Sequence, residues 1–125
     1  MFGSYNIQSV VAALEFDPAA DATIPVFRAP HPLTVVGCHV TLTSAIASDG
    51  TNYFAASLKN GSDVVGSPVG GADTAWVALT PKSMTIDTTT AFVDEGDVLA
   101  VFYNENGTGT FGQMTVQIDY VHGEA

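Results

Sequence analysis

Two runs near the end of the chain decide the fold: Phe92-Val-Asp-Glu-Gly-Asp-Val-Leu-Ala-Val-Phe-Tyr103 and Gln113-Met-Thr-Val-Gln-Ile-Asp-Tyr-Val121. In the second run, apolar and polar residues alternate, which is the period of a strand with one buried face. The first run enters its strand through an acidic turn that contains Gly96, and acids beside glycine are ordinary turn formers. We therefore expect two long antiparallel strands at this end of the chain.

Shorter strand-like runs lie upstream, between clusters of glycine, proline and asparagine. They span 22–28, 33–46, 52–59, 63–65, 74–79 and 83–86, and 9–16 reads as either a strand or a short helix. Pro25 assigns the first of these to a sheet edge, because proline lacks the N–H that a central strand donates. Residues 66–73 and 105–112 are predicted loops, and Asn60-Gly61 is a predicted type I′ turn.

The run over 33–46 carries the longest alternation upstream of the closing pair. Its apolar row is Val36, Cys38, Val40 and Leu42. A period of two predicts that this row is buried and that His39 lies on the opposite, polar face. Cys38 is the single cysteine, so the chain forms no internal disulfide and the thiol is expected to be a small core group.

About eight short strands without an amphipathic helix predict an all-β chain, an antiparallel β-sandwich of the jelly-roll type. An immunoglobulin-like sandwich is the second option, although the chain lacks the cysteine pair that favours it. The 125 residues suit one domain. We place this domain at 9–125 and assign 1–8 to an N-terminal arm.

The charge of the chain excludes several functions. Only Arg28, Lys59 and Lys82 are positive, and the net charge is −10. Binding of nucleic acid or of an anionic membrane surface requires clustered lysine and arginine, so neither partner is expected. Charged residues make up only 13% of the chain, against roughly 25% in an average domain. Such a surface suits a protein whose sides are covered by other subunits.

The N-terminal residues lack a basic segment followed by an apolar run, so no signal peptide is expected. No apolar stretch approaches the ~18 residues of a membrane-spanning helix. We also find no catalytic motif and no histidine with a second ligand at metal spacing. The sequence therefore predicts a protein that is not an enzyme and that has no cofactor.

Three acids, Asp94, Glu95 and Asp97, lie within four residues around Gly96. Carboxylates in such turns can bind hard cations such as Ca²⁺. The spacing of an EF-hand is absent, and the same residues form ordinary solvated turns. We expect the solvated turn and keep a cation site as the alternative.

Both faces of the run over 98–104 are apolar. Leu99, Val101 and Tyr103 share one face, and Val98, Ala100 and Phe102 share the other. A strand of a sandwich has only one inner face, so the other face needs a cover. We predict a subunit interface that contains Leu99, Val101 and Tyr103; an overlying N-terminal segment is the alternative.

The run Glu95-Gly-Asp-Val-Leu-Ala-Val-Phe-Tyr103, a Gly/Thr loop and Met114-Thr-Val-Gln-Ile-Asp-Tyr120, in an acidic chain rich in Thr, Gly and Ala, resemble small jelly-roll virion proteins of tailed bacteriophages. These proteins include capsid decoration proteins and the heads of fibres. The closing pattern is more loosely similar to trimeric C1q/TNF-like jelly rolls. The resemblance covers about 92–120 and transfers no functional residue, because these proteins share an architecture rather than a site.

The resemblance implies a homotrimer that decorates and stabilises a phage head, made in the host cytoplasm and located on the virion. Its partners are then further copies of itself and the major capsid protein. In that case the arm contacts the capsid through Phe2, Tyr5 and Ile7. The alternative reading is a receptor- or carbohydrate-binding head of a phage fibre.

Overall fold

A computed structural model of the chain describes residues 6–14, 20–109 and 111–123, and this part of the chain is built from β-strands without a helix. The strands are β1 (Gln8–Leu14), β2 (Ala22–Arg28), β3 (Leu33–Leu42), β4 (Tyr53–Asn60), β5 (Asp63–Gly70), β6 (Lys82–Ser83), β7 (Phe92–Val93), β8 (Val98–Asn106) and β9 (Met114–His122). The all-β prediction is confirmed.

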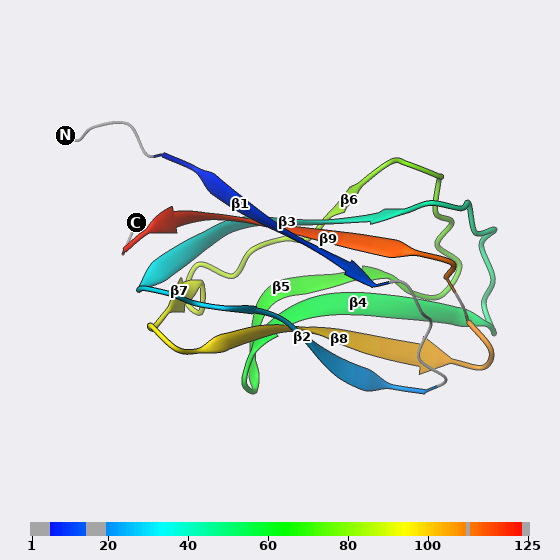
Figure 1. Ribbon diagram of the computed structural model, residues 1–125. Helices are drawn as coiled ribbons and strands as arrows, with labels where there is room; N and C mark the ends of the chain where they lie inside the picture. Colours follow the sequence, from blue (N-terminus) through cyan, green and yellow to red (C-terminus); the bar gives the residue numbers. More distant parts are fainter. Residues whose placement is uncertain (1–5, 15–19, 110, 124–125) are drawn as a thin grey trace.

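The strands form two antiparallel sheets that pack face to face (Figure 1). One sheet has the order β1-β9-β3-β6, with β7 also paired to β3, and the other has the order β2-β8-β4-β5. The chain changes sheet at most connections, and the first and last long strands are neighbours. Apart from the short β7, this is the eight-strand order of a jelly roll.

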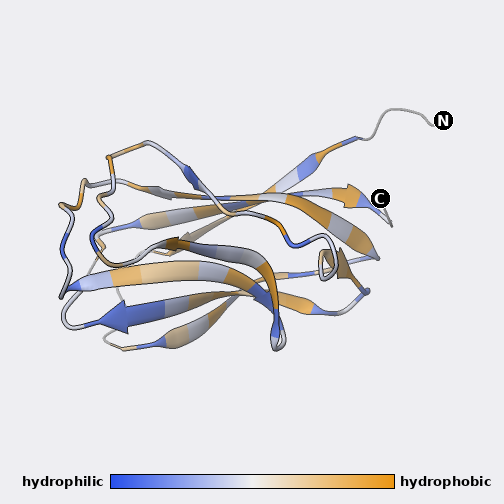
Figure 2. Cartoon of the chain, turned by 180° about the vertical axis from the view of Figure 1, so that it is seen from behind, coloured by the Kyte–Doolittle hydropathy of each residue, from blue (hydrophilic) through white to orange (hydrophobic). Residues whose placement is uncertain are grey.

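The core lies between the two sheets and follows the predicted alternation of β9. Met114, Val116 and Ile118 point inward and are almost fully buried, whereas Thr115 and Gln117 alternate with them. Figure 2 shows the same alternation of apolar and polar residues along the strands. The β-period in the sequence therefore located the inner face of this strand correctly.

Aromatic rings fill one end of the core. The ring centroid of Phe54 lies 5.4 Å from that of Trp76, 5.3 Å from that of Tyr103 and 5.5 Å from that of Phe111. All four side chains are at most 4% exposed. Trp76 belongs to no strand and forms a single bridge to Ile46, which also lies outside the strands, so the predicted strand over 74–79 is wrong.

The predicted inward row of β3 is correct at one end only. Cys38, Val40 and Leu42 are buried, but Val36 is 43% exposed and Val35 points inward in its place. The pairing of β3 with β9 shifts register between Val35 and Gly37. This β-bulge adds one residue to the strand. Side chains before the bulge therefore point to the opposite face from the one that the alternation predicts.

The buried thiol of Cys38 has lost its usual acidity. Burial, with a smaller contribution from the negative charge of Asp119, raises its pKa to about 12. The thiol is therefore protonated at physiological pH and behaves as the small core group that the sequence predicts.

Pro25 lies in β2 at the edge of its sheet, as predicted. The predicted loop over 66–73 is wrong in its first part, because β5 continues to Gly70 with Pro68 inside it. β5 is the other edge of the same sheet, where proline removes no bond from a central ladder. β8 likewise continues to Asn106, beyond the predicted start of a loop at Glu105.

The hairpin between β4 and β5 exists, but its turn is one residue later than predicted. Asn60 pairs with Asp63, so the two loop residues are Gly61 and Ser62. Gly61 has a φ of 62°, and neither Asn60 nor Ser62 has a positive φ. A positive φ at the first loop residue alone corresponds to a type II′ turn rather than type I′.

The facing of β8 can be tested by two adjacent truncations. Leu99→Ala removes a side chain with no exposed surface and should lower the free energy of unfolding by about 2–5 kcal/mol. Val98→Ala, on the outer face, should change it by about 0.5 kcal/mol or less. Urea denaturation of both variants measures the difference, and similar losses would contradict this orientation.

Candidate interaction surfaces

The predicted interface residues lie inside the sandwich of a single chain. Leu99 and Val101 have no exposed surface and Tyr103 is 1% exposed. The Tyr103 hydroxyl lies 2.9 Å from the carbonyl oxygen of Gly109 and 2.8 Å from a carboxylate oxygen of Glu105. The prediction therefore chose the wrong face of the strand: apolar alternation identifies two faces but does not say which one points to the opposite sheet.

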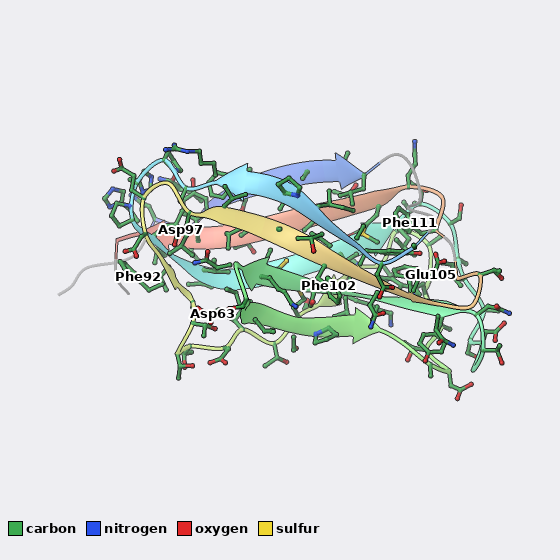
Figure 3. All side chains as sticks on the ribbon, turned by 90° about the horizontal axis from the view of Figure 1, so that it is seen from below. Asp63, Phe92, Asp97, Phe102, Glu105 and Phe111 are labelled. Atoms are coloured by element: carbon green, nitrogen blue, oxygen red, sulfur yellow. The ribbon has the colours of Figure 1, made fainter. Side chains whose placement is uncertain are left out.

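The outer face of β8 carries the other apolar row. Val98 is 43% exposed, Ala100 is 8% exposed and Phe102 is half-buried. The Lys59 ammonium lies 4.3 Å from the centroid of the Phe102 ring, in cation–π contact. Figure 3 views this face, with Phe102 near its centre. We name the outer side chains Val98, Ala100, Phe102 and Lys59 the β8 patch.

A groove opens beside the other sheet. It has a volume of about 460 Å³ and is bordered by β3, β7 and the segment before β7. Its lining residues are Thr34, Val35, Val36, Ile86, Thr88, Ala91 and Phe92. None of these side chains is charged, and Val36 and Phe92 are each at least 40% exposed. The β-bulge of β3 created this groove wall by turning Val36 outward, so no periodic signal in the sequence pointed to it.

Hydrogen bonds within the acidic turn between β7 and β8, and between this turn and neighbouring segments, hold it in place. The amide of Asp97 donates to the carbonyl of Asp94, and the amide of Gly96 donates to the carbonyl of Ala29. The Asn60 side chain donates to the Asp97 carboxylate at 3.1 Å. Within residues 6–14, 20–109 and 111–123, no group of three acidic, histidine or cysteine side chains is arranged to hold a metal ion.

Of the predicted capsid contacts, Ile7 is 64% exposed just before β1. Phe2 and Tyr5 lie outside the described residues. Gln8, which we assigned to the arm, is the first residue of β1 and pairs with Tyr120. In the described part of the chain, no helix is long and apolar enough to cross a membrane.

A polar cluster on the outer face of the first sheet was not predicted. The Asp119 carboxylate accepts hydrogen bonds from the Ser9 hydroxyl at 2.6 Å and from the Gln117 amide at 2.9 Å. Nε2 of His39 lies 3.0 Å from the same carboxylate, and Nδ1 of His39 lies 2.8 Å from the Ser83 hydroxyl. The sequence expected His39 on a polar face but gave no signal for its partners, which are 44 and 80 residues away.

The cluster links four strands and keeps Asp119 ionised. Burial acts to raise the pKa of Asp119, but the hydrogen bonds from Ser9, Gln117 and His39, with the charge of His39, lower it below its ordinary value. The order serine–histidine–carboxylate is that of a nucleophilic triad. Here its members stand on neighbouring strands of one sheet, β6, β3 and β9, and they hold those strands together.

Comparison with known proteins yields a distant likeness of fold. No protein-family model matches the chain, and no curated protein sequence matches it. One similar solved structure is the "Structure of infectious bursal disease virus Gx strain", with a TM-score of 0.40 and 14% identity. The likeness covers 94% of this chain and 32% of that chain, so this chain spans about a third of the length of the viral one. A likeness at this level says nothing about function.

The ionised Asp119 predicts an acid-dependent loss of stability. A carboxyl group whose folded pKa is lowered stabilises the fold above its unfolded pKa and loses that contribution as the pH falls through the folded pKa. Asp119→Asn should therefore cost about 0.5–1.5 kcal/mol at neutral pH, and the gap to the wild type should shrink below pH ~4. Thermal or urea unfolding between pH 7 and pH 2 measures this gap.

Asp63→Asn serves as the control, because Asp63 is exposed at the start of β5. This variant should follow the wild type over the whole range. A gap for Asp119→Asn that stayed constant with pH would show that its carboxylate charge does not contribute.

Proposed function

We propose that this chain is a non-enzymatic structural protein of a virion, a decoration protein that binds the head of a tailed bacteriophage as a homotrimer and stabilises it. The observation that carries the proposal is where the charges lie. Among the described residues, the two outer sheet faces carry few charged side chains, Lys59 and Asp119 among them, while most carboxylates lie in loops or at strand ends. This distribution suits a subunit that packs against its neighbours in a particle through the outer faces of its sheets.

Among the described residues, most acidic side chains lie between strands. These are Asp21, Asp49, Asp73, Asp87, Asp94, Glu95 and Asp97. Asp63 and Glu105 are within two residues of a strand end, so Asp119 is the one mid-strand acid in the described part of the chain. Figure 3 places Asp97 toward one end of the sandwich and Glu105 toward the other. Subunits that touch through their sides therefore avoid bringing these carboxylates together.

The β8 patch is the proposed contact within the trimer. It combines an exposed valine, a half-buried aromatic ring and one of the three cations of the chain. Aromatic anchors of this kind dominate the energy of protein interfaces. Lys59 can also pair with a carboxylate of a neighbouring copy, which partly offsets the repulsion between acidic subunits.

The proposed contact with the capsid uses the arm, through Phe2, Tyr5 and Ile7. Such a protein needs no catalytic group. A ligand that binds the assembled shell and not the dissociated subunits stabilises the shell by mass action. The expected effect on the head is therefore a rise in the temperature at which it loses its subunits.

The alternative function, a carbohydrate-binding fibre head, calls for an exposed aromatic platform beside polar side chains. Trp76 is 3% exposed and stacked on Phe54. The depression next to it, lined by Asp49, Asn52 and Tyr53 among others, has a volume of only about 10 Å³. That space holds at most one water molecule, so Trp76 offers no platform for a sugar.

The trimer can be tested with one charge substitution. Light scattering of the wild type should show a species with three times the mass of one 13.0 kDa chain. Phe102→Glu should abolish the three-chain species, because it places a carboxylate in the β8 patch. Val77→Glu, at a residue that is 63% exposed and belongs to no strand, should leave the trimer intact.

Binding to the head is tested separately, by co-sedimentation with expanded empty heads of the phage that encodes the protein. The wild type should sediment with the heads at saturable stoichiometry, and Ile7→Ser should reduce the bound fraction. Failure to bind any head, together with selective binding to a glycan array, would overturn the proposal in favour of the fibre head.

A further inference from the structure

The edges of the two sheets differ in how they are protected. A strand at a sheet edge presents unpaired N–H and C=O groups that can pair with another chain. Proteins block such pairing with proline, charge, β-bulges or very short strands. This sandwich has β2 and β5 at the edges of one sheet, and β1 opposite β6 and β7 in the other.

Three of these edges have a feature that hinders pairing with another chain. β2 contains Pro25 and a register shift between Pro25 and Phe27. β5 contains Pro68 and pairs with β4 through two register shifts. β6 and β7 are two residues long. A second chain therefore finds no long regular ladder at any of these three edges.

β1 has none of these features. Its seven residues, Gln-Ser-Val-Val-Ala-Ala-Leu, include no proline, glycine or charged side chain. Every one of them pairs with β9 without a register shift. Val11 is 59% exposed, and Ser9 and Ala13 are exposed on the same face. Among the described residues, the backbone hydrogen bonds of loops and turns do not involve β1, so nothing there pairs with its outer edge.

We propose that β1 pairs antiparallel with β1 of a second copy, about a two-fold axis near Val11. The sheet that contains β1 in one copy then becomes continuous with the same sheet of the second copy. Antiparallel pairing about such an axis is isologous, because the same strand serves both sides. The inference goes beyond the proposed decoration role and depends on the edge alone; in the proposed trimer, the β1 edges would remain available to join neighbouring trimers.

The lack of charged side chains on β1 favours a second copy of this chain as the occupant. Each chain carries a net charge of −10, so two copies associate favourably only where carboxylates are absent. β1 contributes no charge. The carboxylate of Asp119, which pairs with Ser9 across the ladder, already accepts hydrogen bonds from Ser9 and Gln117 and faces His39.

The side chains of β1 also complement themselves. Pairing centred on Val11 sets Val11 opposite Val11 of the second copy, and Ser9 opposite Ala13. Directly opposed β-branched residues stabilise an antiparallel pair, and the small side chains on either side leave room for close approach. The pairing would cover Val11, the most exposed apolar side chain of this strand.

The first test changes the residue on the axis. Val11→Lys places two ammonium groups opposite each other and should weaken the β1–β1 contact roughly tenfold. Val11→Thr keeps the β-branched shape without a charge and should retain the contact. Sedimentation equilibrium over a range of concentrations measures both, and exchange of the β1 amides with deuterium should slow as the wild-type concentration rises.

The second test is a disulfide cross-link, whose result does not depend on contacts through other surfaces. In air, dissolved oxygen should oxidise two Val11→Cys thiols to a disulfide-linked pair, because directly opposed residues on antiparallel strands lie about 4.5–5.5 Å apart. Val77→Cys, at a residue that is 63% exposed and lies outside both proposed contacts, is the control and should stay unlinked at the same concentration.

Three results would overturn the inference. They are equal self-association of Val11→Lys and the wild type, no preferential cross-link at position 11, and protection of the β1 amides that does not depend on concentration. The last result would mean that the chain covers its own edge. Head binding and the effect of Phe102→Glu are measured independently, so failure of this inference leaves the proposed function standing, and the reverse also holds.

Discussion

The contact between the inward rows of β9 and β8 is the interaction on which the rest of the structure depends. β9 is paired on both sides, with β1 and β3, and β8 is paired on both sides, with β2 and β4. Each is thus the strand through which its sheet is assembled. Their inward side chains are almost completely buried, and this burial of apolar surface is the main term that offsets the chain entropy lost on folding. Residues outside these rows are consequently not required to fill the core.

The placement of polar groups follows from that constraint. Sheet faces accept few carboxylates, since a charge there must be hydrogen-bonded or solvated. The one mid-strand acid among the described residues, Asp119, meets this condition through Ser9, Gln117 and His39. The remaining described acids stand in turns and at strand ends, where water reaches them. A strongly acidic chain thereby keeps broad sides on which neighbours can pack.

Several parts of this arrangement were predictable from the sequence. Strict alternation identified β9 and its inner face, and Pro25 correctly marked an edge strand. Both signals are local: they depend on one side chain or on a period of two residues. The number of sheets and the jelly-roll class followed from counting such runs.

Other parts depend on contacts that no local pattern contains. The bulge near Val36 is fixed by how β3 meets β9, and it decides which valine is buried. For β8, whose two faces are both apolar, the choice of inner face depends on the opposite sheet. The prediction for Leu99, Val101 and Tyr103 failed for that reason. The Asp119 cluster joins residues up to 110 positions apart, which places it beyond any motif.

The burial of Cys38 has a practical and biological consequence. Its thiol has no exposed surface and stays protonated far above neutral pH, so it is a poor nucleophile toward oxidants, alkylating reagents and maleimide dyes. The folded protein should therefore behave alike in reducing cytoplasm and in aerated water outside a cell. A fluorophore attached through a newly introduced surface cysteine would report on that position alone, with the native sulfur left in place.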